Sequence, residues 1–323
     1  VMVKKIYKIT KVDANQRADK YIQKVLSRAP RSFIYRQFRR KDIKINGFTA
    51  LPQSILVEGD ELIIFLTDQQ LKDFSTIYVF ERIPMTADII YEDDVILVLN
   101  KPRGLLVHST RLERVKTLTN EVLTYLESKG EFDPSNRGFI PSPVHRLDQE
   151  TTGLIVFAKT LEVAQILSDA LSERDEVVRK YYALCSGKLQ KEGEIKFELE
   201  KDEDAFISIV KKNYNEEKER KKDAITKYKA IKYFKNITFV EIHLVTGRFN
   251  QIRAHFSAIN HPLLGDLKYG DRTLNEYLNV FRLCLHAGEL KFKKLPHPYS
   301  YLNKKTFIAE LPDDMKEIIE KIK

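Results

Sequence analysis

The sequence predicts a globular protein with two domains, each built from helices and strands, and three observations support this. The chain has 323 residues, which is enough for two hydrophobic cores. Residues 1–66 combine short helical and strand patterns, and their fourteen Lys and Arg against six Asp and Glu give +8 of the total charge of +9. From Ile89 onward, longer apolar runs of strand-forming residues alternate with helical patterns.

Two helices are predicted at the start of the basic segment. Apolar residues recur at helical spacing over residues 13–29, and Pro30 ends this first helix. Ser32 is expected to cap a second helix that runs to about Arg40. A strand, a tight turn and a closing strand are expected to follow at residues 43–45, 46–47 and 62–66.

Basic residues gather on and beside the second predicted helix. They are Arg28, Arg31, Arg36, Arg39, Arg40, Lys41 and Lys44. Guanidinium groups on a short helix can contact several phosphates at once, with strongly salt-dependent affinity. We therefore expect this domain to bind a polyanion, the alternative being an ordinary solvated basic face.

A second, larger domain is expected after a connecting segment. Residues 67–87 are polar and mixed, which predicts a linker between a domain at 1–66 and a domain at 88–323. Strands are expected at residues 95–99, 154–158, 180–185, 224–233, 238–245 and 283–292. Helices are expected at residues 118–127, 161–171, 250–258 and 313–322. A loop over 131–143 and exposed hairpins or loops over the charged residues 188–223 complete the prediction.

Several classes of chemistry are not supported by the sequence. It contains no phosphate-binding Gly-Lys-Ser/Thr loop, no dinucleotide glycine fingerprint and no Gly-x-Ser-x-Gly elbow. The two cysteines are far apart and the histidines are scattered, so no metal site is expected, and His145, His255 and His286 are expected to be structural. The low cysteine count favours a reducing cytoplasm, and we see neither a membrane span nor the apolar core of a signal peptide.

The stretch of most chemical interest is the polar run from His145 to Thr152, which Gly153 joins to an apolar strand. Asp148 lies in this turn, two residues after Arg146. Such an Asp is often only a turn-capping residue, but an arginine can also hold a carboxylate ionised as a nucleophile. Glu150 is a possible second carboxylate of a glycosidase, but groups two positions apart in one turn are poorly placed on opposite faces of a sugar.

Residues 15–66 resemble the RNA-binding domain named after ribosomal protein S-four. The resemblance is carried by Arg17–Ile22, by Arg31-Ser32 with Ile34, by Asp42–Gly47 and by Val57–Asp60. It implies that the expected polyanion is RNA.

Residues 89–295 resemble the RluA family of pseudouridine synthases in four ordered blocks. The blocks are Tyr91–Asp93 with Asn100–Leu105 and Val107-His108; His145–Asp148 with Thr151–Leu154 and Ala158-Lys159; Arg179–Tyr181 with Ala183 and Gly187; and Thr246–Arg248 with Gln251–His255, His261-Pro262, Gly265-Asp266 and Tyr269-Gly270. Two departures stand out, Phe249-Asn250 where the family usually has Thr-His, and Thr152 where Ser is common.

The resemblance implies an α+β fold, with a mixed, mainly antiparallel β-sheet catalytic core, flanking helices and a small N-terminal α/β RNA-binding domain. It also implies isomerisation of uridine in RNA, most often large-subunit ribosomal RNA, without cofactor or metal. Asp148 is then the nucleophile, on the sugar or on the base, Arg253 is its ion-pair partner and Tyr181 lies against the base and relays a proton. The implied substrate-binding residues are Arg146, Ile252, Lys101 and Asn250.

The resemblance further implies a monomer that works on RNA away from membranes. The departure at Asn250 places one substrate or backbone contact in question. Taken singly, Tyr181 and Ile252 could be core residues and Arg253 a surface ion pair. The rival hypothesis is a ribosome assembly factor that binds RNA on the same scaffold and performs no chemistry.

Overall fold

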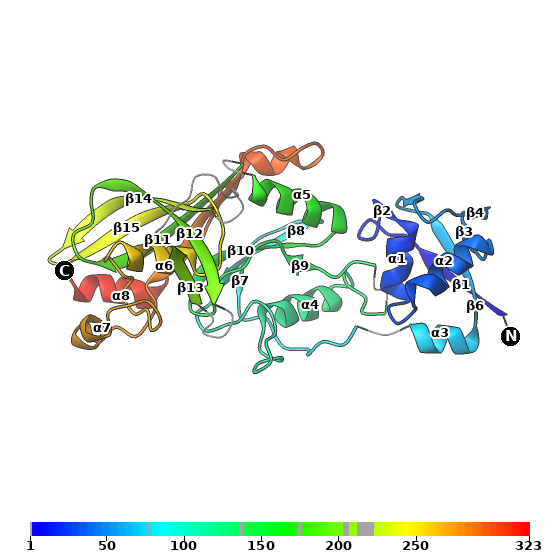
Figure 1. Cartoon of the computed structure of the whole chain (residues 1–323), viewed down its shortest axis with the longest axis horizontal. Helices are drawn as coiled ribbons and strands as arrows, with labels where there is room; N and C mark the ends of the chain where they lie inside the picture. The colour runs from blue at the N-terminus through cyan, green and yellow to red at the C-terminus, as the bar shows by residue number, and fades with distance from the viewer. Residues whose placement is uncertain (1, 76–77, 136–137, 174–175, 203–206, 212–222) are drawn as a thin grey trace.

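The computed structural model describes residues 2–75, 78–135, 138–173, 176–202, 207–211 and 223–323. The molecule is elongated, with a small N-terminal domain at one end and a long sheet with flanking helices at the other (Figure 1). The two parts touch where Asn15 Nδ2 donates to Glu162 Oε2 at 2.9 Å and the amide of Leu161 donates to the Val12 carbonyl at 3.3 Å. No helix in the described ranges is both long and apolar enough to span a bilayer.

The N-terminal domain packs two helices against one face of a sheet with strand order β1-β6-β3-β4. Its elements are β1 (Met2–Lys8), α1 (Ala18–Val25), α2 (Arg31–Arg39), β3 (Ile43–Ile45), β4 (Phe48–Thr49) and β6 (Glu61–Thr67), with a separate pair β2 (Gln16–Arg17) and β5 (Ile55–Leu56). Helical spacing turns Tyr21, Ile22 and Val25 of α1 into the core. The periodic pattern therefore identified the buried face of this helix correctly.

Three local predictions for this domain are corrected by the structure. β1 is an additional strand, paired with β6 over its whole length, and its mostly exposed residues give no apolar alternation to detect. α1 starts only at Ala18, because Asn15 adopts a left-handed conformation (φ 63°) and Gln16-Arg17 pair with β5. Ser32 does not cap α2, which begins at Arg31 with Pro30 at the N-cap.

The stretch expected to be a linker is packed along most of its described length. Residues Asp68–Phe74 form α3, with a capping box between Thr67 and Gln70, and the Phe74 ring lies 4.7 Å from Phe33. Further on, Phe80 is buried and the guanidinium of Arg82 pairs with Glu127 at 2.7 Å. Polar composition alone did not reveal these contacts, because α3 has no buried residue and its cap uses polar side chains.

The large domain is organised by one sheet with strand order β13-β12-β14-β15-β11-β16-β10-β8-β7. The strands are β7 (Asp88–Glu92), β8 (Ile96–Lys101), β9 (Ser142–Pro143), β10 (Thr152–Ala158), β11 (Val177–Ser186), β12 (Glu192–Asp202), β13 (Ile207–Lys211), β14 (Asp223–Phe234), β15 (Ile237–Leu244), β16 (Leu285–Phe292) and β17 (Phe307–Ile308). The helices are α4 (Leu118–Ser128), α5 (Leu161–Ser172), α6 (Gln251–Ala258), α7 (Arg272–Leu278), α8 (Asp313–Lys321) and a 3-10 turn (Tyr299–Lys304). Among the described strands only β10 and β16 pair in parallel, so the fold is the expected α+β class with a mixed, mainly antiparallel sheet.

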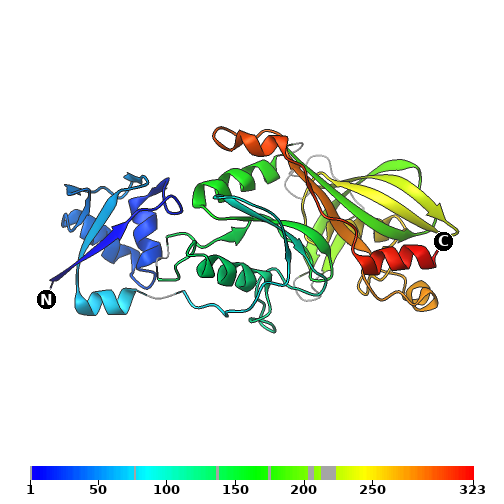
Figure 2. The same cartoon turned by 180° about the vertical axis from the view of Figure 1, so that it is seen from behind.

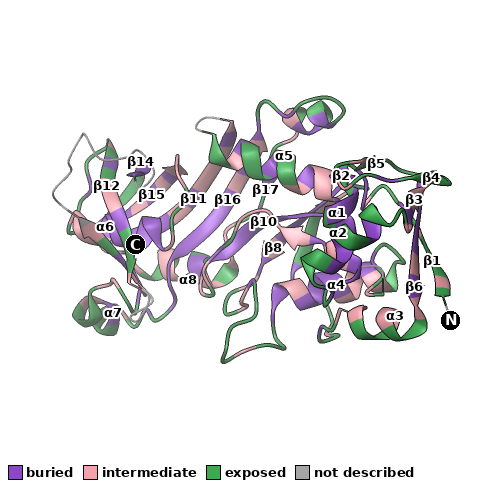
Figure 3. Ribbon diagram, turned by 45° about the vertical axis from the view of Figure 1, so that its right-hand side comes forward, coloured by how far each residue is buried: buried purple, intermediate pink, exposed green. Residues whose placement is uncertain are grey.

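Both faces of the central strands are covered, which explains the continuous apolar run of β10. Alternate residues Ile155 and Phe157 pack toward α4 and α6, while Leu154 and Val156 pack toward α5 on the other face. Figure 2 shows α4 and α5 on opposite sides of these strands, and Figure 3 shows β10 and β16 mainly in the colour of buried residues. The turn that precedes β10 is therefore attached to a strand that is buried along its whole length.

The position of Gly153, at the start of β10, requires glycine because of its backbone conformation and because the backbone of Ala287 lies close to it. Its φ of 111° is rare for residues with a side chain, and a Cβ atom would lie 2.7 Å from the backbone carbon and nitrogen of Ala287. We expect Gly153→Ala to lower the free energy of unfolding by about 3 kcal/mol, from backbone strain plus overpacking. The matched control is Gly130→Ala, at φ 73° with open space around it, which should cost only about 1 kcal/mol of strain. Equal losses in chemical denaturation would contradict the overpacking argument.

Candidate active site

The turn that carries Asp148 is anchored on both sides. The Gln149 carbonyl accepts from the backbone N–H of Gly104 at 2.9 Å and from the ammonium of Lys101 at 2.9 Å. The amide of Thr151 donates to the Asp148 carbonyl at 3.1 Å, and Thr152 continues into buried β10. Asp148 is thus presented by a backbone that has little freedom to move.

Lys101, which the sequence predicts to bind substrate, is not among the residues that line the pocket. Its side chain is fully buried, and the ammonium donates to the carbonyls of Pro102, Leu105 and Gln149 at 2.9, 2.8 and 2.9 Å. All three N–H donors of the ammonium are therefore occupied. Burial lowers the pKa of Lys101 to about 8, with the charges of Glu150 and Asp148 opposing this effect. Lys101 holds the Asp148 turn against the loop after β8.

The Asp148 carboxylate receives two hydrogen bonds, both on Oδ2. Arg253 Nη1 donates at 3.0 Å and Asn250 Nδ2 donates at 2.5 Å. Oδ1 has no hydrogen-bond partner within the ranges that the structure describes, and the side chain keeps 21% of its surface exposed. One carboxylate oxygen is therefore fixed, and the other is open to the pocket.

Arg253 is itself fixed by a second carboxylate. Its Nε and Nη2 donate to the two oxygens of Asp266, both at 2.8 Å, and the Asp266 side chain is fully buried. Burial opposes the charge on Arg253, but the hydrogen bonds and charge of Asp266, and then those of Asp148, raise its pKa overall. The fork geometry of this pair leaves Nη1 aimed at Asp148.

Asn250, which the sequence predicts to bind substrate, lines the pocket and is held by protein groups. Asn250 is buried at the N-cap of α6 in a left-handed conformation (φ 49°), and both ends of its amide contact protein groups. Nδ2 donates to Asp148, while Oδ1 accepts from the Tyr269 hydroxyl at 3.2 Å. That hydroxyl in turn accepts the amide of Ser208 at 2.5 Å, so its proton points to Oδ1 and fixes the orientation of the amide.

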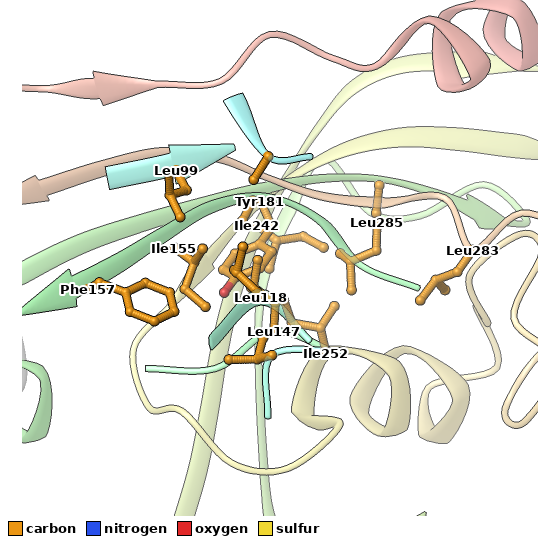
Figure 4. Packing of buried hydrophobic residues seen from close by; sticks show 14 of the residues in the cluster. Leu99, Leu118, Leu147, Ile155, Phe157, Tyr181, Ile242, Ile252, Leu283 and Leu285 are labelled. Atoms are coloured by element: carbon orange, nitrogen blue, oxygen red, sulfur yellow. The ribbon is translucent and has the colours of Figure 1, made fainter. Parts of the chain in front are cut away.

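Tyr181 and Ile252 line the same pocket as Asp148. Tyr181 is 7% exposed on β11, directly after a register shift in that strand, and Ile252 is 5% exposed on α6. Figure 4 shows both side chains grouped with Leu147, which links the Asp148 turn to the core. Burial raises the pKa of Tyr181 to about 12, with Arg179 opposing and Asp148 adding to the shift, so its hydroxyl is protonated at neutral pH.

The pocket has a volume of about 510 Å³, which suits a nucleoside-sized ligand. Asp148, Tyr181 and Ile252 lie among its walls, and Arg146 and Arg248 are exposed residues of its lining. The guanidinium of Arg146 lies 5.6 Å from the ring centroid of Phe249. The structure thus brings the predicted Asp148, Tyr181, Arg253, Arg146 and Ile252 together from three distant parts of the chain.

Most of the predicted RNA-binding residues share one exposed region of the N-terminal domain. Those exposed on and around α2 are Arg28, Arg31, Arg36, Arg39, Arg40 and Lys41. Lys44 does not join them. It follows the core residue Ile43 on β3, so it points away from the helices, and its ammonium lies 5.8 Å from the Phe65 ring centroid.

Sequence reasoning missed four residues of the site. Asp266, Tyr269 and Ser208 support Arg253 and Asn250, and Arg179 lines the pocket with its Nη2 donating to the Val245 carbonyl at 3.0 Å. Asp266 and Tyr269 were named only as parts of the fourth motif block, and Arg179 only as part of the third, with no role in the site. The position of Arg179 two residues before Tyr181 on one strand could have placed it there. Ser208 gave no local signal, since its role depends on the β12–β13 hairpin reaching α6.

The three histidines near the site are held by the fold. The Val156 amide donates to Nε2 of His145 at 3.2 Å, and burial, with the charge of Arg179, lowers the pKa of His145 to about 3. His286 lies between the Thr152 hydroxyl, 2.8 Å from Nδ1, and the Ala309 carbonyl, 2.9 Å from Nε2. His255 is fully buried with no hydrogen bond on either ring nitrogen within the described chain. Among the residues that the structure describes, no group of side chains could hold a metal ion.

His255 makes the stability of the protein sensitive to acid. Burial lowers its pKa to about 4, below the ordinary value of 6.5, so below pH 6.5 protons bind preferentially to the unfolded chain. His255 therefore removes about 3 kcal/mol of stability as the pH falls from 6.5 to 4. We expect His255→Phe, which keeps a ring against Phe197, to gain stability relative to wild type over this window. Urea unfolding measures the free energy of unfolding of both proteins at the two ends of this pH window. A difference between variant and wild type that is the same at both ends would contradict this expectation.

Comparisons with known proteins show the family of the chain. The family model for RNA pseudouridylate synthase matches residues 95–258. An uncharacterized RNA pseudouridine synthase of Mycoplasma capricolum is 32% identical over 94% of this chain and 97% of its own length. The ribosomal large subunit pseudouridine synthase D of Yersinia pestis is 33% identical over 95% of this chain and 91% of its own length.

A comparison with solved structures finds a similar fold. The structure of human RNA pseudouridylate synthase domain containing 4 matches with a TM-score of 0.55 and 22% identity, over 72% of this chain and 92% of that one. The family match and these two relatives define an RNA-modifying enzyme of the pseudouridine synthase class. The chain belongs to the RNA pseudouridine synthase family, and it is an isomerase that converts uridine in RNA to pseudouridine.

Proposed function

We propose that Asp148 is the nucleophile of this isomerisation and that the substrate is large-subunit ribosomal RNA. The assignment of Asp148 as the nucleophile rests on the asymmetry of its carboxylate. Oδ2 is held by Arg253 and Asn250, and Oδ1 is open to the pocket. A carboxylate that is oriented by an arginine and one amide is ready to attack without reorganising. The relatives named for the large ribosomal subunit support the substrate.

The proposed chemistry needs only protein side chains. Oδ1 of Asp148 forms a bond to the target nucleotide, the bond between N1 and C1′ breaks, the base turns, and C5 bonds to C1′. The bond between Asp148 and the nucleotide then breaks, which restores the free carboxylate. One proton leaves C5 and one is gained at N1, so the reaction needs no oxidant, reductant or cofactor. Tyr181 packs against the base. Its hydroxyl, which is protonated at neutral pH, relays the C5 proton by donating its own proton as it accepts that one. Ile252 forms an apolar floor, and the target uridine reaches it by leaving its stack, which costs a few kcal/mol.

Pseudouridine mapping tests this proposal. A large-subunit ribosomal RNA transcript, free of modification, is incubated with the protein, and pseudouridine is located by chemical mapping. We expect one or a few discrete positions to be modified by the wild type. RNA binding without any pseudouridine would support the non-catalytic assembly factor instead, and modification only of other RNAs would overturn the ribosomal substrate.

We further propose that the exposed basic residues around α2 bind RNA, that the S-four-like domain spans residues 1–66 and that the protein works as a monomer in the cytoplasm.

Replacing Arg36, Arg39 and Arg40 by Gln is expected to weaken RNA binding and to reduce the slope of log affinity against log salt by about 2–3. The control replaces Lys316, Lys321 and Lys323 by Gln, an equal charge change at the opposite end of the molecule (Figure 1). Equal effects of the two triple variants would show that net charge, not this surface, drives binding.

A further inference from the structure

Phe249 lies in the wall of the pocket with two cations over its ring. The ring is half-buried, and its centroid is 5.6 Å from Cζ of Arg146 and 5.5 Å from Nζ of Lys201. Arg146 belongs to the Asp148 turn, and Lys201 belongs to β12. Phe249 directly precedes Asn250, the N-cap of α6, so three segments that are distant in the sequence meet here. None of the proposed catalytic steps uses this ring.

The backbone that carries the ring is fixed. The Ser208 hydroxyl donates to the Phe249 carbonyl, and the next residue, Asn250, is held between Asp148 and Tyr269. The two cations, by contrast, are on long, exposed side chains. A fixed aromatic ring beside exposed cations is the arrangement with which proteins stack unpaired nucleobases and hold their phosphates.

We propose that Phe249 is a stacking platform for the nucleobase next to the target uridine. On binding, Arg146 and Lys201 leave the ring for the flanking RNA phosphates, because a charge-assisted bond to phosphate is stronger than contact with an exposed ring. When the target uridine leaves its stack, the neighbouring base loses a partner, and the Phe249 ring replaces it. The platform favours a purine neighbour, because its larger ring system stacks more strongly. The inference rests on the proposed function for the target's position in the pocket.

The test uses a short RNA stem–loop with a single uridine in its loop and the fluorescent base 2-aminopurine on one side or the other. Wild type and Phe249→Tyr are expected to quench one of the two probes, and Phe249→Leu is expected to lose that quenching. Phe249→Leu should also bind the RNA about tenfold more weakly, the loss of one stacked base. The matched control is Phe239→Leu, since Phe239 is also half-buried and stacks on Tyr182 at 6.1 Å but does not line the pocket.

A second measurement separates stacking from a loss of folding. An abasic residue in place of the neighbouring base should weaken binding by wild type and have no further effect on Phe249→Leu. Equal quenching by wild type and Phe249→Leu, or an abasic effect that is the same in both, would overturn the platform even if wild type forms pseudouridine. Full pseudouridine formation by Asp148→Asn, with quenching still dependent on Phe249, would instead sink the nucleophile assignment alone.

Discussion

Asp148→Asn is expected to lower the rate of pseudouridine formation by roughly 10⁴-fold or more, the order of effect of removing a covalent nucleophile. The amide keeps the size of the side chain and an oxygen that can accept from Arg253, but it cannot attack the nucleotide. RNA binding and the melting temperature should change little, because Arg253 keeps its bidentate pair with Asp266. The measurement is single-turnover formation of pseudouridine on the ribosomal transcript.

The matched control is Glu150→Gln, which neutralises a carboxylate two residues further along the same turn. Glu150 pairs with the Arg103 guanidinium at 2.7 Å, and both side chains are more than 40% exposed. An exposed pair of this kind contributes little to stability, so the variant should keep its activity within a few-fold. If Glu150→Gln lost as much activity as Asp148→Asn, a two-carboxylate mechanism would have to be reconsidered.

Arg253→Met is expected to damage both stability and catalysis. The substitution leaves the fully buried Asp266 carboxylate without its cation, which should cost about 3–5 kcal/mol of unfolding free energy. It also removes one of the two donors on Asp148 Oδ2, which should slow the reaction by roughly 10²–10³-fold. Denaturation and single-turnover rates measure the two losses separately.

Adding Asp266→Asn to Arg253→Met distinguishes the two roles. The neutral amide needs no cation, and its oxygen can still accept the backbone amides of Lys268 and Tyr269. We therefore expect the double variant to recover most of the lost stability and none of the lost activity. Recovery of activity together with stability would mean that Arg253 acts only by keeping the protein folded.

The sequence alone was sufficient for much of the architecture. The period of apolar residues identified the buried face of α1, and the uninterrupted run at 154–158 identified β10 as a buried strand. The ordered motif blocks led to Asp148, Tyr181 and Arg253 as partners before any geometry was known. Local composition could not show that β1 pairs with β6 or that residues 68–74 form α3, because β1 is mostly exposed and α3 contributes only the partly buried Leu71 and Phe74 to the core.

Only the tertiary structure decided how the carboxylate of Asp148 is held. Lys101 and Asn250 looked like substrate ligands because both are polar and lie in motif blocks, yet one is enclosed by carbonyls and the other spans Asp148 and Tyr269. The contacts of such polar side chains are made between segments about a hundred residues apart in the sequence. The spacing of residues within one motif carries no information about these contacts. The sequence therefore determined the family and the nucleophile candidate at residue 148. The fold determined that one oxygen of that carboxylate is bound while the other remains open, because Arg253, Asn250 and Asp266 meet only when the sheet and α6 are assembled.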